Sequence, residues 1–481
     1  MNKNALTLLL IASLAAALTS CGGEPPASDT TAASADTTAV AVTEPTETLG
    51  LPEGLTYGGY EFTILTRPDA RAKELIAEEE IGETLNDAVF RRNQTVEELL
   101  NISFDYQLSS SDYETDALAS LMAGDDAYDV IFPAARAAFI YAQNDVCLNW
   151  FDIPNLDLTK SWWIQDMAQN FAIGGKLYAM YGDLSHASLE SSVGMVFNKG
   201  MFDDYKVEYP YELVREGKWT FDAFAGMAQK FSSDLNGDGK LDIKNDQYGY
   251  GTNHWCGPIN ALYCTGERII TLNNAGVPEL TLYSEQVVDI YDKFMTLLLS
   301  DCGWNQLGGA DHQTAFCEGR FAFVDINIKV LSQPLFRQSD VEFGLIPWPK
   351  SQESVDKYYS FVDAGCSLGI IPVTNTDTAR TGAVLEAMAY YGQKFIIPAY
   401  YDISLQSKFL RDDTSVEMLD YISEGRTFDL GYYNNSQFGG KLANPGYDMV
   451  HNTSLTFSAH YAAHEQSVLA LIEKSTAMYM E

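Results

Sequence analysis

The 481-residue chain contains 66 acidic and 30 basic side chains, which give it a formal net charge of −36 at neutral pH. Such a charge repels nucleic acids and anionic lipid headgroups, so neither is an expected partner. Hydrophobic residues make up 46% of the chain, which is enough for a packed core. About 430 residues follow the N-terminal segments, and that length favours two lobes over a single core.

The first 54 residues carry signals for export and anchoring. Lys3 precedes an apolar stretch, residues 5–18, which is too short to span a bilayer comfortably and is typical of a signal peptide (1–20). This stretch ends in Leu-Thr-Ser-Cys, which resembles the lipobox of bacterial lipoproteins. The resemblance implies cleavage before Cys21 and diacylglycerol on its thiol. The alternative is an ordinary secretory signal with a coincidental cysteine.

A Thr-, Ala-, Ser-, Pro- and Glu-rich segment follows the lipobox. Together with Cys21 it fills residues 21–54, and it buries too little apolar surface to offset its chain entropy. We expect a disordered tether that holds the folded body away from the membrane. The expected location is therefore the extracytoplasmic face of the bacterial membrane, with the lipid as the membrane contact.

The folded body begins with alternating strands and helices. Hydrophobic spacing predicts strands over 60–65, 102–108 and 128–132, and helices over 84–100 and 113–122. This alternation is typical of a parallel sheet covered by helices. Further strands are predicted over 192–198, 248–250, 321–326, 341–346 and 368–373, and helices over 220–231 (with Thr220 as N-cap) and 376–391.

Four short patterns together resemble the extracellular solute-binding proteins of ABC importers, specifically the maltose-binding-like group. They read G-K-L-Y-A-M (175–180), V-F-N-K-G-M-F (196–202), W-T-F-D-A-F (219–224) and F-G-L-I-P-W-P (343–349). Each pattern alone is weak, but their order and spacing cover most of residues 57–481. Tyr181 departs from the family pattern, which usually has proline at this position.

The resemblance implies an α/β, periplasmic-binding-protein-like type II fold, with two α/β lobes, a hinge and a ligand cleft between the lobes. Motif positions place the crossings near 183–190, 363–367 and 411–414. The N-terminal lobe then comprises 55–183 and 368–411, and the C-terminal lobe 187–364 and 414–481. Hinge closure around the ligand follows from such an architecture.

The implied function is capture without chemistry. A monomeric receptor would bind a small solute, most readily an oligosaccharide or another carbohydrate, and deliver it to the transmembrane permease subunits of an ABC importer. The identity of the solute, and the choice between import and sensing, stay open at this point.

An acidic loop, residues 234–246, matches the first half of an EF-hand-type calcium loop. Oxygen-bearing side chains alternate along it, and glycine stands sixth, at Gly239. Asn245 occupies the twelfth position in place of the bidentate Glu, and Asp246 follows directly. An Asx-rich turn without metal is the alternative. The expected ligands of a structural Ca²⁺ ion are Asp234, Asn236, Asp238, Lys240 (through its carbonyl), Asp242 and Asp246.

Sugars are bound by aromatic rings that stack on their C–H faces and by charged or amide groups that hold their hydroxyls. Trp255 follows a predicted strand in the region that supplies a stacking aromatic in the family, although a core tryptophan explains it equally well. Trp219 and Trp348 are expected to be structural. Arg67 and Arg136 follow strands of the first sheet, where ligands bind beyond the carboxyl ends. The polar candidates are Arg67, Arg136, Glu190, Asp325 and Asp363.

These polar candidates each have a structural alternative. Asp325 interrupts an apolar strand, where an unpaired carboxylate is costly, and a salt-bridged structural aspartate explains it as well. For the two arginines, a surface role is the more common one. Beyond Cys21, the six cysteines at 147, 256, 264, 302, 317 and 366 either pair or remain buried thiols.

Two other functional classes fit the same sequence. A secreted lipoprotein glycoside hydrolase needs paired carboxylates, but 66 acidic residues offer no basis for choosing a pair, and G-x-S-x-G and H-E-x-x-H motifs are absent. His460 and His464 lie at i, i+4 spacing without a clear third ligand, which favours packing over zinc. A sensor or an adhesin would use the same fold.

Overall fold

Two β-sheets organise the chain, and all their strands except β8 (Gly303–Gln306) were predicted from the sequence. The computed structural model describes residues 47–68, 70–110, 116–307, 311–406 and 412–480. The signal peptide, Cys21 and most of the predicted tether lie outside these residues. None of the described helices combines the length and apolarity needed to cross a bilayer.

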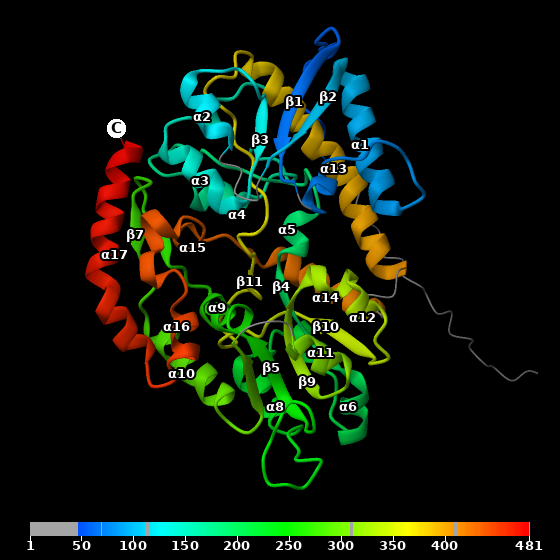
Figure 1. Ribbon diagram of the computed structural model, residues 1–481, viewed down its shortest axis with the longest axis vertical. Helices are drawn as coiled ribbons and strands as arrows, with labels where there is room; N and C mark the ends of the chain where they lie inside the picture. Colours follow the sequence, from blue (N-terminus) through cyan, green and yellow to red (C-terminus); the bar gives the residue numbers. More distant parts are fainter. Residues whose placement is uncertain (1–46, 69, 111–115, 308–310, 407–411, 481) are drawn as a thin grey trace, which may run out of the picture. The chain divides into compact units, whose positions relative to one another are not determined.

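The first sheet has three parallel strands in the order β2-β1-β3. They are β1 (Tyr60–Thr66), β2 (Ile102–Leu108) and β3 (Val130–Phe132). Helix α1 (Thr84–Leu100) connects β1 to β2 and packs along α13 (Thr378–Gln406), as Figure 1 shows. The alternation of strand and helix expected for this part of the chain is therefore confirmed.

The second sheet has five strands in the order β10-β4-β9-β5-β8. Strand β5 pairs in parallel with β8 and β9, whereas β4 is antiparallel to β9 and β10. All six residues of β4 are buried, as expected for an apolar strand covered on both faces. The strands are β4 (Val193–Asn198), β5 (Tyr248–Asn253), β8 (Gly303–Gln306), β9 (Phe321–Asn327) and β10 (Phe343–Ile346).

Aromatic packing holds helix α8 (Phe221–Ala228) against the second sheet. Thr220 caps this helix through its hydroxyl, which accepts a hydrogen bond from the Ala223 amide, as predicted. Phe323 of β9 lies 5.3 Å from Phe224 and 6.0 Å from Trp219, measured between ring centroids. Trp219 and Trp348 are both buried, with exposures of 0% and 1%, so their structural role is confirmed.

The remaining elements connect and cover the two sheets. The longer helices are α2 (Asp116–Ala123), α3 (Ala135–Gln143), α9 (Cys256–Tyr263), α10 (Glu285–Leu298), α14 (Asp413–Glu424) and α17 (Phe457–Met480). The shorter helices are α4 (Gln165–Asn170), α5 (Ala187–Glu190), α6 (Lys199–Tyr205), α7 (Tyr211–Arg215), α11 (Asp311–Cys317), α12 (Pro334–Arg337), α15 (Leu430–Tyr433) and α16 (Pro445–His451). Two-stranded pairs are β6 (Ile270–Leu272) with β7 (Pro278–Leu280), and β11 (Ser360–Phe361) with β12 (Arg426–Thr427).

Two predicted elements differ from the structure. The helix expected over 376–391 extends to Gln406, through Pro398, because Ile396 and Ala399 pack against Ala88 and Val89 of α1. This packing outweighs the hydrogen bond that a proline removes. The strand expected over 368–373 forms isolated bridges instead, because its residues pair with three different segments, at Ile131, Met180 and Cys147.

Helix α17 contacts segments that are far apart in the sequence. Near its start, Phe457 stacks on Tyr291 of α10 at 5.1 Å. At its end, Tyr479 lies 6.0 Å from Tyr178, and the Met480 sulfur would lie only 2.6 Å from a Cβ at Gly174. The helix also positions His460, which is 3% exposed and bonds the Lys441 carbonyl at 3.1 Å. A packing role for this histidine, as expected, is consistent with these contacts.

All six cysteines of the folded body are free thiols, and five of them are buried. The structure thus decides between the two alternatives that the sequence left open. Burial raises the pKa of the Cys147 thiol far above its usual value, as expected for a thiol removed from water.

Candidate functional site

One stretch, residues 360–371, runs from the second sheet to the first; we call it the crossing segment. At its start, Val362 bridges Ser192, directly before β4, and the Asp363 amide donates to the Ser191 carbonyl at 2.9 Å. Further along, Ile370 bridges Ile131 of β3. This path includes one of the three crossings inferred from the sequence. The lobe boundaries themselves stay a prediction.

Two arginine side chains that follow β1 bind the middle of the crossing segment. Arg67 directly follows β1, is 5% exposed, and donates to the Gly365 carbonyl at 2.7 Å. Arg71 donates to the same carbonyl. The Gly365 amide donates to Asp363 Oδ1 at 2.8 Å. A Cβ at Gly365 would lie 2.7 Å from that oxygen, so a larger residue here would displace the Asp363 carboxylate.

Arg136 lies in the first turn of α3, just after β3. Its guanidinium carbon sits 4.8 Å from the centroid of the Tyr432 ring, a cation–π geometry. Its Nε is buried and has no hydrogen-bond partner among the described residues. Burial raises the pKa of the Tyr432 hydroxyl, the Asp363 carboxylate adds to this effect, and Arg136 opposes it. The Tyr432 ring therefore packs against Arg136, and its hydroxyl lies within the electrostatic influence of Asp363.

The second sheet contributes the ends of two parallel strands. Asn253 ends β5 and Asn327 ends β9, and the Cys256 thiol lies between them, 3.7 Å from Asn253 Nδ2 and 3.7 Å from Asn327 Oδ1. Burial raises the pKa of this thiol, the Asp325 and Asp363 carboxylates raise it further, and Lys329 lowers it. Lys329 follows β9 by two residues and is half-buried.

These groups form what we call the cross-sheet cluster. Some of its groups lie at or after the carboxyl ends of β1, β3, β5 and β9, and the others belong to the crossing segment and α15. In open α/β sheets, ligands bind beyond such strand ends. The sequence predicted its members Arg67, Arg136 and Asp363. It missed five others, although the rule about strand ends, applied to β5 and β9, would have found the two asparagines. The cluster comprises Arg67, Arg136, Asn253, Cys256, Asn327, Lys329, Asp363 and Tyr432.

Trp255 immediately precedes Cys256 of the cluster, at the start of α9. Its ring is 43% exposed and lies 5.0 Å from Tyr447 of α16, while Tyr447 lies 4.3 Å from His451. The indole is therefore not a core tryptophan, which was the structural alternative. An exposed ring supported by a second aromatic offers a face on which a sugar ring can stack.

Glu190 ends α5, outside the contacts that define the cluster. Its carboxylate lies 3.6 Å from His186 Nε2, and the His186 ring stacks on Tyr400 of α13 at 5.2 Å. Burial lowers the pKa of His186, and the nearby Glu190 carboxylate opposes this shift. Glu190 therefore contributes, through His186, to the packing of α5 against α13.

Asp325 lies inside the second sheet and is fully buried. It accepts hydrogen bonds from the Tyr250 hydroxyl at 2.8 Å and the Thr252 hydroxyl at 2.9 Å. A Cβ at Gly257 would lie 2.9 Å from Asp325 Oδ2, so α9 packs directly over the carboxyl group. Burial raises the pKa of Asp325 to about 7. These contacts favour the structural alternative over direct contact with a ligand.

The acidic loop directs its oxygens toward its own backbone. Asp234 accepts from the amides of Gly237 and Gly239 at 2.7 and 2.8 Å, and Asp246 accepts from those of Leu235 and Asp242 at 2.9 and 2.8 Å. Gly239 adopts φ +79°, in line with the sharp turn predicted there. Asn236, Asp238 and Asp242 likewise accept from backbone amides, and Lys240 is exposed.

This arrangement fits a cation only in part. Among the described residues, no three His, Cys, Asp or Glu side chains are gathered closely enough to hold a metal ion. The loop as folded therefore resembles the Asx-rich turn that was the alternative to a calcium site. Calcium binding stays a prediction.

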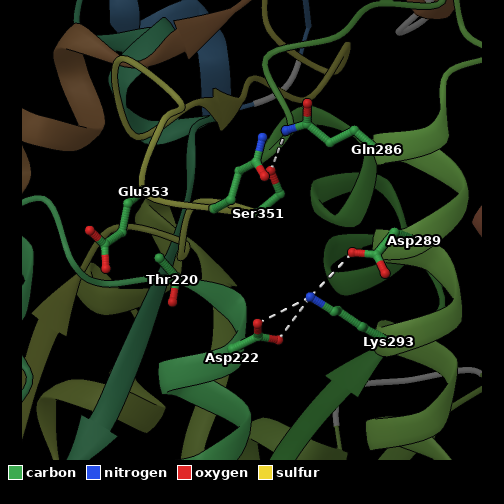
Figure 2. A pocket seen from close by; sticks show the side chains of 8 residues that line it. Thr220, Asp222, Gln286, Asp289, Lys293, Ser351 and Glu353 are labelled. Atoms are coloured by element: carbon green, nitrogen blue, oxygen red, sulfur yellow. Dashed lines mark hydrogen bonds and ion pairs between the residues drawn. The ribbon is translucent and has the colours of Figure 1, made fainter.

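A surface pocket of about 240 Å³ lies elsewhere, lined by residues of α8, α10 and 351–353. Figure 2 shows two sets of paired side chains there: Lys293 Nζ lies 3.0 Å from Asp222 Oδ1 and 3.2 Å from Asp289 Oδ2, and Gln286 Nε2 donates to the Ser351 hydroxyl at 2.6 Å. A second pocket of about 300 Å³ lies beside Trp150 and Gln165. Neither contains a residue of the cross-sheet cluster, and we favour the cluster as the site because it lies beyond the strand ends of both sheets.

Comparisons at the level of sequence and of structure give different results. No protein-family model matches the chain, and no curated protein matches it. Solved structures of ABC solute-binding proteins do match its fold, at 13–14% sequence identity. UgpB of Mycobacterium tuberculosis, in complex with glycerophosphocholine, has 14% identity and a TM-score of 0.54, over 87% of this chain and 99% of that one.

Two further structures match over a similar extent. The GacH receptor of Streptomyces glaucescens, solved unliganded and with acarbose, has 13% identity and a TM-score of 0.52, over 86% of this chain and 99% of that one. The ABC substrate-binding protein Lmo0181 of Listeria monocytogenes, in complex with cycloalternan, has 14% identity and a TM-score of 0.50, over 87% and 99%. The chain thus has the mixed α/β, periplasmic-binding-protein-like fold of these solute-binding proteins, as its sequence patterns implied.

Proposed function

We propose that this protein is the solute receptor of an ABC importer and that it binds an oligosaccharide or another carbohydrate. The observation that carries the proposal is the cross-sheet cluster, in which polar side chains beyond the strand ends of both sheets meet at a crossing segment. Ligand sites of open α/β sheets lie beyond such ends. The structures of GacH and Lmo0181 support the ligand class, because they were solved with acarbose and cycloalternan.

In this proposal the two parts of the site have different tasks. Arg136 and Asp363 hold hydroxyl groups through charge-assisted hydrogen bonds, and Trp255 with Tyr447 stacks on the apolar face of a sugar ring. A ligand that contacts both sheets binds more tightly when they approach each other, so occupancy favours a closed arrangement. Binding and release then require no covalent chemistry.

Anchoring belongs to the same proposal. A lipid on Cys21, followed by the tether that the sequence predicts, would keep the receptor beside the permease. Replacing Cys21 with Ala tests this: labelled palmitate is expected to be incorporated into the wild-type protein and not into the variant. Equal labelling of both would remove the lipid anchor from the proposal.

A thermal-shift screen followed by calorimetry tests the ligand class. Selective binding to the native protein at a hundred times the dissociation constant stabilises it by about 2.7 kcal/mol. We expect such a shift with mono- or oligosaccharides and none with peptides or polyamines. If the protein instead hydrolyses a glycoside and forms no stable complex with it, the glycoside hydrolase becomes the better hypothesis.

Uptake distinguishes an importer subunit from a sensor or an adhesin. Cells that lack the gene are expected to lose uptake of the sugar identified in the screen, and a plasmid copy is expected to restore it. Unchanged uptake, together with a changed transcriptional response to the sugar, would assign the protein to sensing.

A further inference from the structure

Two histidines lie close together at the surface next to Trp255. His254 directly follows β5 and is half-buried, and His451 ends α16 and is exposed. Their ring centroids are 5.3 Å apart. The Tyr447 ring packs against both, at 5.1 Å from His254 and 4.3 Å from His451. The residue after β5 and the end of α16 thus bring two imidazoles together from distant parts of the chain.

The same nitrogen is available in both rings. His254 Nδ1 bonds the Leu307 carbonyl at 2.7 Å, and His451 Nδ1 bonds the Tyr447 carbonyl at 2.8 Å. Because a carbonyl only accepts, each Nδ1 carries the proton, and each Nε2 of a neutral ring carries a lone pair. Neither Nε2 has a hydrogen-bond partner among the residues that the structure describes. Histidines that ligate metals have this arrangement, in which a backbone carbonyl fixes the tautomer and orients the ring.

The separation of the two rings suits a shared metal ion. A zinc–nitrogen bond is about 2.0–2.1 Å long, so two imidazoles on one tetrahedral ion have ring centroids about 5 Å apart. The observed 5.3 Å is close to this value. Water would supply the remaining positions, because the described part of the chain gathers no third His, Cys, Asp or Glu side chain with this pair.

Another histidine pair shows what such a site requires. His460 and His464 of α17 are closer to each other, with ring centroids 4.8 Å apart. However, His460 is 3% exposed, and its Nε2 bonds the Lys441 carbonyl at 3.1 Å. A nitrogen that bonds a carbonyl carries a proton and has no lone pair for a metal. The pair formed by His254 and His451 differs because neither of its Nε2 atoms has such a partner within the described ranges.

We propose that His254 and His451 bind one borderline divalent cation, of the class of Zn²⁺ and Cu²⁺, through their Nε2 atoms. Neutral imidazole suits these ions, whereas Ca²⁺ and Mg²⁺ prefer oxygen ligands. Neither histidine belongs to the cross-sheet cluster or to the acidic loop. The metal site is therefore independent of the proposed carbohydrate function, and either can fail without the other.

Titrations with metal ions test the site. The purified protein, carrying a purification tag without histidine, is titrated by calorimetry with CuCl₂ and with ZnCl₂ at pH 7.5, where free imidazole is mostly neutral. We expect one equivalent of either ion to bind. The electron paramagnetic resonance spectrum of the Cu²⁺ complex should show coupling to two nitrogens. A hundredfold excess of Mg²⁺ should not displace the ion, because Mg²⁺ prefers oxygen ligands.

Matched variants assign the two ligands. His254→Gln and His451→Gln are each expected to weaken Cu²⁺ binding at least tenfold and to reduce the spectrum to one coupled nitrogen. Without metal, both variants should melt within about 2 °C of wild type, because neither side chain is fully buried. His464→Gln is the matched control, because His464 belongs to the pair whose other member is already engaged, and this variant should bind Cu²⁺ as the wild type does.

The proposal fails on any of three results. If neither Cu²⁺ nor Zn²⁺ binds the wild type, the pair is only part of the aromatic packing beside Trp255. If the His254 and His451 variants bind Cu²⁺ as tightly as the wild type, the ion is held elsewhere. If His464→Gln abolishes binding and the other two variants do not, the site belongs to α17.

Discussion

The acidic loop and the cross-sheet cluster are both polar, but they use their polar groups in opposite ways. In the loop, carboxylates from one short stretch accept hydrogen bonds from the backbone of that same stretch, as Asp234 and Asp246 do. In the cluster, side chains from several elements meet, and Arg136 retains an unpartnered Nε. The comparison teaches that a dense polar motif can be satisfied within one stretch, whereas the cluster depends on side chains that distant elements bring together.

The largest expected effect concerns Asp325, which lies beneath the cluster. Its folded pKa of about 7 exceeds the model-compound value of 3.8, so the folded state binds the proton more tightly than the unfolded one. The stabilisation is complete below about pH 4 and is lost as the pH rises through about 7. In urea titrations, Asp325→Asn should lose about 4 kcal/mol of this pH dependence relative to wild type, at about 1.36 kcal/mol for each pKa unit.

A parallel fall of both proteins between pH 4 and 7 would show that other groups dominate. Glu386, whose pKa burial raises to about 7, and Asp183, raised to about 6, titrate in the same direction and window. The double variant Asp325→Asn/Glu386→Gln is therefore the natural next measurement, and its curve should be flatter than that of either single variant.

Asp246→Ala tests the self-sufficiency of the loop. The side chain is fully buried and accepts from two backbone amides, so its removal should lower the free energy of unfolding by about 2–4 kcal/mol. Sugar affinity should stay within twofold, because the loop lies outside the cluster. The exposed Asp238, which accepts from the Lys240 amide at 2.8 Å, is the control, and Asp238→Ala should cost less than about 1 kcal/mol.

Substitutions of Tyr432 test whether the cluster, unlike the loop, depends on side chains from distant elements. Tyr432→Leu removes the ring beneath Arg136 and should weaken ligand binding by about 1–2 kcal/mol, measured by calorimetry. Tyr432→Phe retains the ring and should bind within threefold of wild type. Equal losses in both variants would point to the hydroxyl group instead of the ring.

Calcium gives the smallest expected effect. If the loop binds Ca²⁺ with a dissociation constant near 1 mM, as weak oxygen sites do, 5 mM Ca²⁺ stabilises the protein by about 1 kcal/mol. Asp234→Ala should abolish this shift in thermal melts, with Mg²⁺ as the control ion. If the melting temperatures in Ca²⁺ and in chelator are identical, the loop is an Asx-rich turn that needs no bound ion.

Sequence periodicity predicted the elements that are strongly patterned. The strands 60–65 and 321–326 and the helix 84–100 appear within one residue of their predicted bounds. Periodicity did not predict the full length of α13, because packing against α1 extends this helix past Pro398. The pairing of residues 368–373 with three separate segments likewise has no local signal.

The site was predictable only in part, for a related reason. The rule about strand ends identified Arg67 and Arg136, and the family resemblance identified Asp363. Tyr432 and Lys329 have no local signature, because their place in the cluster depends on how α15 and the segment after β9 approach the crossing segment. Asp325 shows the converse, since its position within an apolar strand indicated importance without revealing that Tyr250 and Thr252 donate to one of its oxygens.

The exposure of Trp255 gives the protein a built-in optical probe. Five of its seven tryptophans are buried (Trp150, Trp162, Trp163, Trp219 and Trp348) and Trp304 is half-buried, whereas Trp255 is 43% exposed. A collisional quencher such as iodide should therefore act mainly on this indole. The quenchable, red-shifted fraction of the fluorescence reports on the surface beside Cys256, so occupancy can be followed in real time without a label.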